Sequence, residues 1–443
     1  MIYKNRLIET IKYKVDAVTV SPLSIKEDEE NLKIDDVTGR FYIPGSSVAG
    51  AFRNYYENYI GNDENSKNVL FGGSDTGMNR LVCYDAFTTD ETIKRMVANR
   101  PGLKIDRRRL TEYYFLSMNK RSGSKFRRHF VNDGIRFSFE FDLNNYDEDC
   151  DFNRLQEQFE RLLSAFAAGD ILLGNNKTVG FGRFEIKSVQ KAAYNLRAYK
   201  DVMNYLLREE KYEDITGSIL YSSSFSHNVR FKITGKTATP LLIKDEVIRL
   251  SGEPDGVNIK NGEGKYIIPG SSLKGVIRTR AEKIVKTFNL DGGIIADIFG
   301  AATDKDTEGH ISRLVCYDTA LNNRKTGLYY KIKIDYFTGG VQKSALMTEE
   351  TVMGELEIEC VFNTYGLKQY EKNIGLLLLV FRDLCTGSLN IGGGYAVGRG
   401  YIKAGRLEVT DGIKEEKMVY DFGNPDKAVE EKFNSYISKL MVG

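Results

Sequence analysis

Two segments of similar sequence combine a Pro-Gly turn, paired serines and downstream basic residues. "YIPGSSVAGAFR" occupies residues 42–53, and "YIIPGSSLKGVIR" occupies residues 266–278. Proline and glycine favour a turn, a serine can cap the following helix, and the N–H groups of its first turn attract anions. We therefore expect both segments to grip phosphates of a nucleic-acid strand. The expected contributors are Ser46, Ser47, Arg53, Ser271, Ser272, Lys274 and Arg278.

The two segments differ at one basic position. Lys274 and Arg278 are spaced i, i+4, so they point to one side of a helix. Arg53 matches Arg278, but Ala49 stands where the second segment has Lys274. The first segment should therefore hold a phosphate backbone less strongly. The alternative interpretation is a solvated basic helix face.

A glycine-rich turn closes each half of the chain: "LGNNKTVGFGRF" at 173–184 and "IGGGYAVGRGYI" at 391–402. Glycine allows close backbone approach to phosphate or sugar, because it has no Cβ. In the second turn we predict contacts from Gly393, Gly394 and Arg399, and in the first from Lys177. The alternative is a plain connection between strands.

Two long inserts differ in charge. Residues 106–131, "DRRRLTEYYFLSMNKRSGSKFRRHFV", interleave arginines with aromatic residues. Arginine neutralises phosphate and aromatic rings stack on bases, so we expect this insert to contact RNA. Residues 335–355 carry little basic charge but include the apolar stretch "SALM". Either insert could instead be an exposed loop. The basic residues expected to bind are Arg107, Arg108, Arg127 and Arg128.

These motifs recur because the chain is duplicated. Pro44 and Pro269 lie 225 residues apart, and the other repeated segments follow in the same order. A period of this length indicates repetition of a whole domain. The sequence pattern of each copy predicts the order strand, helix, strand, strand, insert, strand, helix, strand. This order favours an α+β fold of the ferredoxin-like type. In the repeated "RLVCYD", Cys83 and Cys316 are interpreted as small buried hydrophobes rather than nucleophiles.

Length and composition fit two domains. The 443 residues are 41% hydrophobic and 28% charged, with a net charge of +2. We predict a first domain at 1–190, a helical linker at 191–224, a second domain at 225–410 and a charged helical tail at 411–443. Five cysteines with no CxxC pair argue against a disulfide framework and a zinc site. No signal peptide or membrane-spanning run is evident, so a cytoplasmic protein that does not contact membranes is expected.

The IPGSS segment with its downstream arginine, the Phe-Gly segment and the closing glycine turn resemble the RAMP superfamily of CRISPR-associated proteins. Within it, the chain is most similar to backbone subunits of type III effector complexes, and two tandem copies resemble the fused subunits of type III-D systems. The resemblance implies modified RRM-like domains with inserted thumb hairpins. It also implies CRISPR guide RNA, single-stranded target RNA and other effector subunits as partners.

The resemblance further implies endoribonuclease activity on the target. In the family, an aspartate in the loop before the first helix promotes metal-dependent cleavage, and Asp255 lies at about that position. Its carboxylate could hold a divalent ion, with Mg²⁺ expected, or orient the RNA 2′-hydroxyl. In the first copy Glu30 corresponds, and Asp28 would supply the acid with a shift of register. Cleavage by the first copy is therefore doubtful.

Two rival functions remain open from the sequence. The same architecture could be an RNA-binding scaffold without cleavage, its loop acids serving solubility. It could alternatively process guide precursors by metal-independent acid–base chemistry. The absence of a histidine near the first-helix loop of either copy argues against precursor processing.

Overall fold

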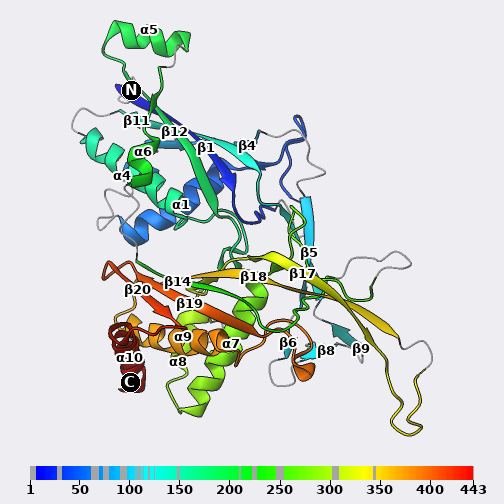
Figure 1. Ribbon diagram of the computed structural model, residues 1–443. Coiled ribbons are helices and arrows are strands. Elements are labelled where there is room, and N and C mark those ends of the chain that lie inside the picture. The colour runs from blue at the N-terminus through cyan, green and yellow to red at the C-terminus, as the bar shows by residue number, and fades with distance from the viewer. Residues whose placement is uncertain are drawn as a thin grey trace. The chain divides into compact units, whose positions relative to one another are not determined.

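The structure is a computed structural model of the 443-residue chain (Figure 1). It describes residues 6–26, 32–60, 69–72, 79–89, 97–103, 105–106, 111–112, 114–117, 120–123, 125–146, 150–208, 211–221, 227–245, 254–301, 309–342 and 346–442; within 101–127 the description is of the backbone alone. No helix in these ranges is long and apolar enough to cross a membrane.

The chain forms two compact units that do not correspond to a single cut in the sequence. The first comprises residues 1–98, 129–177 and 181–226, and the second comprises 99–128, 178–180 and 227–443. Two pieces of the first half of the sequence therefore belong to the second unit. The domain boundaries given above stay predictions.

The first unit is built on an antiparallel sheet with the strand order β13-β12-β1-β11-β4-β2, and β3 also pairs with β11. Its strands are β1 (Glu9–Thr19), β2 (Tyr42–Ile43), β3 (Leu81–Cys83), β4 (Ala86–Thr88), β11 (Arg136–Asn145), β12 (Phe184–Asn195) and β13 (Glu213–Asp214). Its helices are α1 (Gly45–Tyr59), α4 (Phe152–Ala168), α5 (Tyr199–Leu207) and α6 (Thr216–Tyr221).

The second unit repeats this plan with the order β15-β17-β18-β14-β19-β20, and β16 pairs with β18. Its strands are β14 (Asn228–Thr237), β15 (Ile267–Ile268), β16 (Leu314–Cys316), β17 (Thr319–Lys331), β18 (Met347–Asn363), β19 (Ile402–Asp411) and β20 (Glu416–Asp421). Its helices are α7 (Gly270–Thr287), α8 (Gly293–Phe299), α9 (Tyr370–Cys385) and α10 (Lys427–Val442).

The shared order confirms the predicted α+β, ferredoxin-like fold in both copies. The fourth, first, third and second core strands lie side by side, β12-β1-β11-β4 in one unit and β19-β14-β18-β17 in the other. Alternating residues of the central strand, such as Val15 and Phe231, are fully buried. In each unit the two long helices pack against the sheet, as Phe52 of α1 and Phe381 of α9 show. This burial is the main stabilising term of each core.

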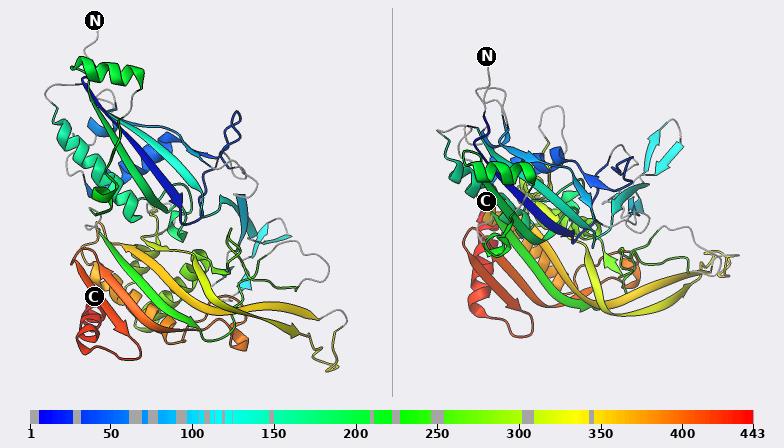
Figure 2. Two further views of the ribbon diagram at one scale, coloured as in Figure 1. Left: turned by 45° about the horizontal axis from the view of Figure 1, so that its top comes forward. Right: turned by 90° about the horizontal axis from the view of Figure 1, so that it is seen from above.

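The basic insert (106–131) and the residues just before it form short strand pairs. β5 (Val97–Leu103) pairs with β10 (Lys125–Val131). Two further two-stranded sheets join β6 (Ile105–Asp106) to β7 (Thr111–Glu112) and β8 (Tyr114–Ser117) to β9 (Lys120–Gly123). In the second unit the corresponding insert is an extension of β17 and β18. Figure 2 shows this hairpin reaching beyond the other strands of its sheet in both views.

The linker and tail contain strands in addition to the expected helices. Residues 213–214 form β13, which adds to β12. In the tail, β20 pairs with β19, and its Met418 is buried in the core at 2% exposure. The helix α10 then packs on α9 through Tyr436 and Leu440.

A carboxylate from the repeated "RLVCYD" segment fixes the start of the first helix in each unit. The Gly45 N–H donates to Asp85 Oδ1 at 2.7 Å, and the Gly270 N–H donates to Asp318 Oδ1 at 2.8 Å. Pro44 occupies the N-cap position of α1, so the expectation of a serine cap is wrong; in α7 the cap is likewise a proline. The serines follow within the first turn.

The helix starts approach the neighbouring strand so closely that only glycine fits. A Cβ on Gly45 would lie 2.1 Å from the Cys83 carbonyl oxygen, and one on Gly270 would lie 2.0 Å from that of Cys316. Cys316 itself is fully buried, and burial raises the pKa of the Cys83 thiol to about 12. Cys316 is therefore the core residue that was expected, whereas Cys83 is half-buried and packs against the core of its unit.

Replacing Gly270 with alanine should destabilise the second unit by about 1–3 kcal/mol, because backbone must move to admit the methyl group. Gly275, in the same helix, has open space at its Cβ position and is the matched control. Gly275→Ala should stabilise by up to about 1 kcal/mol, because alanine is the better helix former. Urea unfolding of both variants checks the pair; equal stabilities would contradict this account of the motif.

Candidate nucleic-acid interface

The arginines that follow the two helix starts are held in the same way. Arg53 Nε donates to Glu57 Oε1 at 3.1 Å, and Arg278 Nε donates to Glu282 Oε1 at 3.0 Å. Both side chains remain partly exposed, at 41% and 31%. The i, i+4 carboxylate therefore orients each guanidinium along its helix.

The serines differ in exposure between the two starts. Ser46 and Ser47 are exposed, whereas Ser271 and Ser272 are half-buried. The N–H group of the glycine before each serine pair already donates a hydrogen bond to an aspartate. One of the free N–H donors at each helix N-terminus is therefore satisfied within the protein. Binding of RNA by the serines and arginines stays a prediction.

Lys274, which the first segment lacks, has a partner inside the second unit. Its Nζ donates to the carbonyl oxygen of Thr178 at 2.9 Å, and residues 178–180 belong to that unit. Burial lowers the pKa of Lys274 to about 8. The lysine thus secures part of the short 3₁₀ turn η1 (Lys177–Val179), and its role as an RNA ligand stays a prediction. Lys177 is exposed overall, although desolvation of its ammonium lowers its pKa.

The glycine turns pack on the end of the first strand of their own copy. In the second turn, Gly393 N donates to the Leu242 carbonyl at 2.8 Å and Gly400 N donates to Pro240 at 3.0 Å. A Cβ on Gly392 would lie 2.4 Å from the Leu242 oxygen. The first turn repeats this, with Gly182 N donating to Pro22 at 2.8 Å. Each glycine turn therefore packs on a repeated Pro-Leu-x-Ile-Lys segment, residues 22–26 in the first copy and 240–244 in the second.

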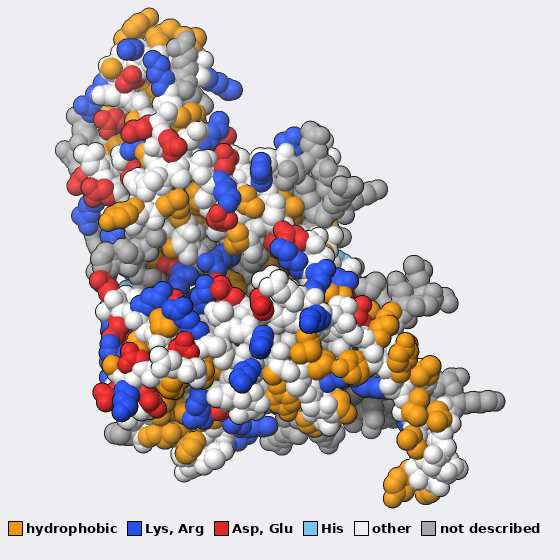
Figure 3. Space-filling model, in the orientation of Figure 1, with side chains coloured by type: hydrophobic (Ala, Val, Ile, Leu, Met, Phe, Trp, Pro, Cys, Tyr) orange, Lys and Arg blue, Asp and Glu red, His pale blue; other side chains and the backbone are white. Residues whose placement is uncertain are grey.

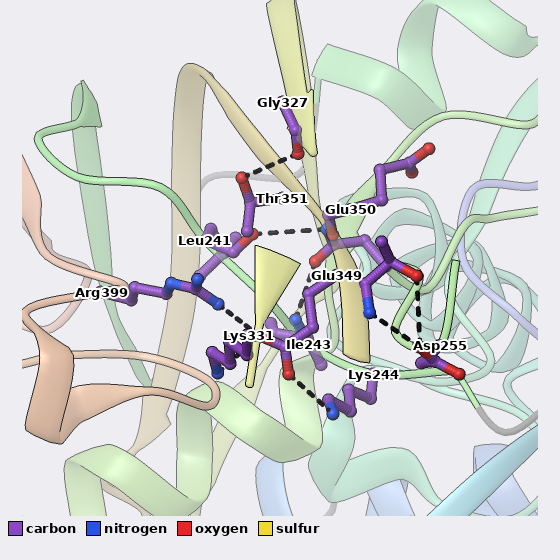
Figure 4. Close-up of polar contacts among 12 residues, drawn as sticks. Leu241, Ile243, Lys244, Asp255, Gly327, Lys331, Glu349, Glu350, Thr351 and Arg399 are labelled. Carbon is purple, nitrogen blue, oxygen red and sulfur yellow. Dashed lines mark hydrogen bonds and ion pairs between the residues drawn. The ribbon is translucent and has the colours of Figure 1, made fainter. Parts of the chain in front are cut away.

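The Asp255 loop is attached to the start of β18. Asp255 Oδ2 accepts hydrogen bonds from the Thr348 N–H at 2.7 Å and from the Thr348 hydroxyl at 3.2 Å (Figure 4). Gly256 forms a parallel bridge with Glu349, and its N–H donates to the Thr348 carbonyl at 3.0 Å. Asp255 is exposed, so its carboxylate is held in place at the surface beside the start of β18, near the outer end of the β17–β18 ladder.

Glu349, next to this loop, binds three cations with one carboxylate. Lys244 Nζ lies 2.9 Å from Oε1, while Lys331 Nζ and Arg399 Nη1 each lie 2.6 Å from Oε2 (Figure 4). The side chain is only 3% exposed. Burial alone would raise the pKa of Glu349, but the hydrogen bonds from the three cations outweigh it and lower the pKa to about 2.

Sequence reasoning missed this cluster. Its members come from the loop after β14, the end of β17, the start of β18 and the glycine turn, and no local spacing relates them. Arg399 was singled out as an RNA contact, but it is 6% exposed and lies 4.6 Å over the Tyr329 ring. Its contact with RNA, like those of Gly393 and Gly394, stays a prediction.

The hairpin ends in exposed aromatic residues. Tyr336 and Phe337 are 94% and 93% exposed. Asp335 Oδ1 accepts from the Phe337 and Thr338 N–H groups and thereby shapes the turn. Of the "SALM" stretch, Leu346 is exposed, and residues 344–345 lie outside the description. Hydrophobic side chains gather over this hairpin in Figure 3.

For several of the predicted site residues, the structure describes the side chain only in part or not at all. Asp28, Glu30, Arg107 and Arg108 lie outside the described residues, and Arg127 is described by its backbone alone. Arg128 is half-buried, and burial lowers its pKa, with the nearby Arg100 adding to the effect. Arg100 Nη1 lies 2.8 Å from Asp318 Oδ2, so the insert contributes a buried ion pair to the second unit.

Among the described residues, no three His, Cys, Asp or Glu side chains gather into a metal-binding group. Glu349 is committed to three cations, so Asp255 is the carboxylate of this region that fits a metal ligand. Magnesium is commonly held by one or two carboxylates together with substrate phosphates and water. Asp255 fits such a substrate-assisted site and does not make a site formed by protein alone.

Replacing Glu349 with glutamine should lower the free energy of unfolding by about 3–5 kcal/mol at neutral pH, because three cations lose their buried counter-charge. The folded-state pKa lies below the ordinary value of 4.5. The stabilisation is therefore complete above pH 4.5 and disappears as the pH falls towards 2. Urea unfolding at several pH values should show the variant and the wild type converging in acid.

Glu357→Gln is the matched control for this measurement. Glu357 lies on the same strand, is 55% exposed and pairs with Lys232 alone among the ion pairs described. Its loss should cost less than about 1 kcal/mol. Equal costs for the two variants would show that the cation cluster does not stabilise the fold.

Comparison with known proteins agrees with the duplicated fold. The family model of the RAMP superfamily matches residues 16–185 and again residues 234–403. No curated protein matches the chain significantly. A solved structure described as the type III-B Cmr-beta bound to cognate target RNA is 17% identical, with a TM-score of 0.31; the match covers 42% of this chain and 61% of that one. The two family matches follow the two sheets, and the chain belongs to the RAMP superfamily.

Proposed function

We propose that this protein is an RNA-binding backbone subunit of a type III CRISPR effector complex and that its second copy cleaves target RNA. The observation that carries the proposal is the exposed Asp255 carboxylate, fixed by Thr348 at the start of β18, on a hairpin with an aromatic tip. Membership of the RAMP superfamily in both halves supports guide RNA and other effector subunits as partners.

The hairpin supplies the means to separate bases. Tyr336 and Phe337 present nearly complete rings to solvent at the turn between β17 and β18. Such rings stack on unpaired bases with little sequence preference. Their insertion between guide and target would leave one target nucleotide unstacked. The Asp255 loop, attached to the same hairpin, would then face the displaced backbone.

Asp255 would act on that backbone in one of two ways. Its carboxylate can orient the 2′-hydroxyl next to the scissile phosphate and accept its proton, which is general-base assistance. A bound Mg²⁺, held by Asp255 and RNA phosphate oxygens, would neutralise charge on the phosphate. The hydrogen bonds from Thr348 keep the carboxylate in position for either role. In the first copy, Asp28 and Glu30 remain the candidate acids.

Asp255→Asn should lower the rate of one target-RNA cleavage event by about 10²–10⁴-fold, because the amide cannot accept a proton or hold a cation as a carboxylate does. The assembled complex, with guide and complementary target, should retain target binding. Cleavage products on a sequencing gel, with and without EDTA, measure the effect and its metal requirement.

Glu263→Gln is the control, since Glu263 is an exposed acid of the same connection that pairs with Lys265. An unchanged cleavage pattern in Asp255→Asn would favour a scaffold without cleavage. Activity of the isolated wild-type protein on guide precursor in EDTA would instead favour the processing function. Either result would overturn the proposed cleavage role.

Replacing Tyr336 and Phe337 together with alanine should weaken the unstacking of target bases, because each base–aromatic stack contributes about 1–3 kcal/mol. Fluorescence of 2-aminopurine placed in the target should fall towards its stacked level. Tyr199→Ala is the control, as Tyr199 is 80% exposed and lies on α5 of the first unit. Fluorescence equal to that of wild type in the double variant would remove the hairpin tip from the proposal.

A further inference from the structure

The cation cluster around Glu349 carries more positive charge than its carboxylate can balance. Lys244, Lys331 and Arg399 supply three positive charges to one buried negative charge. Glu350, the next residue, directs its carboxylate to the Tyr266 hydroxyl at 2.6 Å, beside Arg324 and Lys260. Even with Asp255 included, cations therefore outnumber the acids of the cluster.

The three cations differ in their exposure to solvent, and so in whether they can bind a further anion. Arg399 is buried between Glu349 and the Tyr329 ring, so it serves the protein interior. Lys244 and Lys331 have side chains that are 49% and 39% exposed. An ammonium has three N–H donors, so each lysine can bind Glu349 and donate to a further anion. Two exposed ammoniums are thereby brought together on one carboxylate.

The position of Lys244 relates this pair to the Asp255 loop. A Cβ added to Gly256 would lie 3.2 Å from Lys244 Cε and 3.5 Å from its Nζ, so the lysine passes directly over that glycine. Gly256 follows Asp255 and bridges to Glu349. Lys331 ends β17 and pairs with Met347 at the outer end of the β17–β18 ladder. The Lys244 ammonium therefore lies beside the Asp255 loop, and Lys331 reaches the same Glu349 carboxylate from β17, on the other side of β18 (Figure 4).

We propose that Lys244 and Lys331, aligned by Glu349, form a clamp for one RNA phosphodiester beside Asp255. Glu349 is a positioning residue in this clamp: it holds the two ammoniums at fixed places and does not touch RNA. A phosphate suits the pair because its two non-bridging oxygens can each accept from one lysine. The clamp rests on the proposed function, since it places the target backbone at the loop proposed to cleave it.

The test measures binding of an unstructured oligouridylate to the full-length protein over a range of salt concentrations. For single strands, the slope of log K against log salt changes by about 0.7 for each phosphate contact. The Lys244→Met/Lys331→Met variant should lose about 0.7 from the magnitude of the slope and bind about tenfold more weakly. Each single variant leaves Glu349 two cations, so it should fold and bind about threefold more weakly.

Lys232→Met is the matched control, because Lys232 lies in the same sheet, is 44% exposed and pairs with Glu357. It should leave both slope and affinity unchanged. If the folded single variants bind RNA like Lys232→Met, the clamp is overturned while the RNA-binding function stands. If the wild-type protein does not bind RNA, both the clamp and the proposed function are overturned. Melting temperatures of all variants confirm the folded state.

Discussion

Each half of the protein depends on the contact between a helix-start glycine and the strand that follows the helix. The glycine N–H donates to an aspartate of the "RLVCYD" segment, and the glycine Cα lies almost against a cysteine carbonyl. The glycine and the aspartate that it binds are 40 residues apart in the first copy and 48 residues apart in the second. It sets where the first helix begins, and so it also sets the direction of the arginine two turns later.

A second constraint links the two ends of each copy. The glycine turn near the end of the repeat packs on the Pro-Leu segment of its first strand, through main-chain hydrogen bonds that tolerate little added volume. In the second unit this packing also delivers Arg399 to Glu349. The glycine turn, the Asp255 loop and the outer end of the β17–β18 ladder consequently meet at Glu349, which no single motif in the sequence reveals.

The duplicated α+β fold could be predicted because both the periodic strands and the order of motifs recur along the chain. Capping by serine was a wrong expectation, since Pro44 occupies the N-cap position without a side-chain cap, and Asp85 accepts from the first N–H of the helix, 40 residues earlier. The Glu349 cluster could not be predicted, because its four side chains meet only through tertiary packing. Lys274 stood out in the sequence because the first copy has Ala49 at the matching position. Nothing in the sequence indicated that its partner would be the carbonyl of Thr178.

The assignment of residues 99–128 and 178–180 to the second unit has a genetic consequence. A gene split within the linker would give a C-terminal product lacking the carbonyl that receives Lys274 and the arginine that pairs with Asp318. The second unit thus depends on residues that come from the first half of the sequence. A C-terminal half inherited alone would need new residues to replace these two partners.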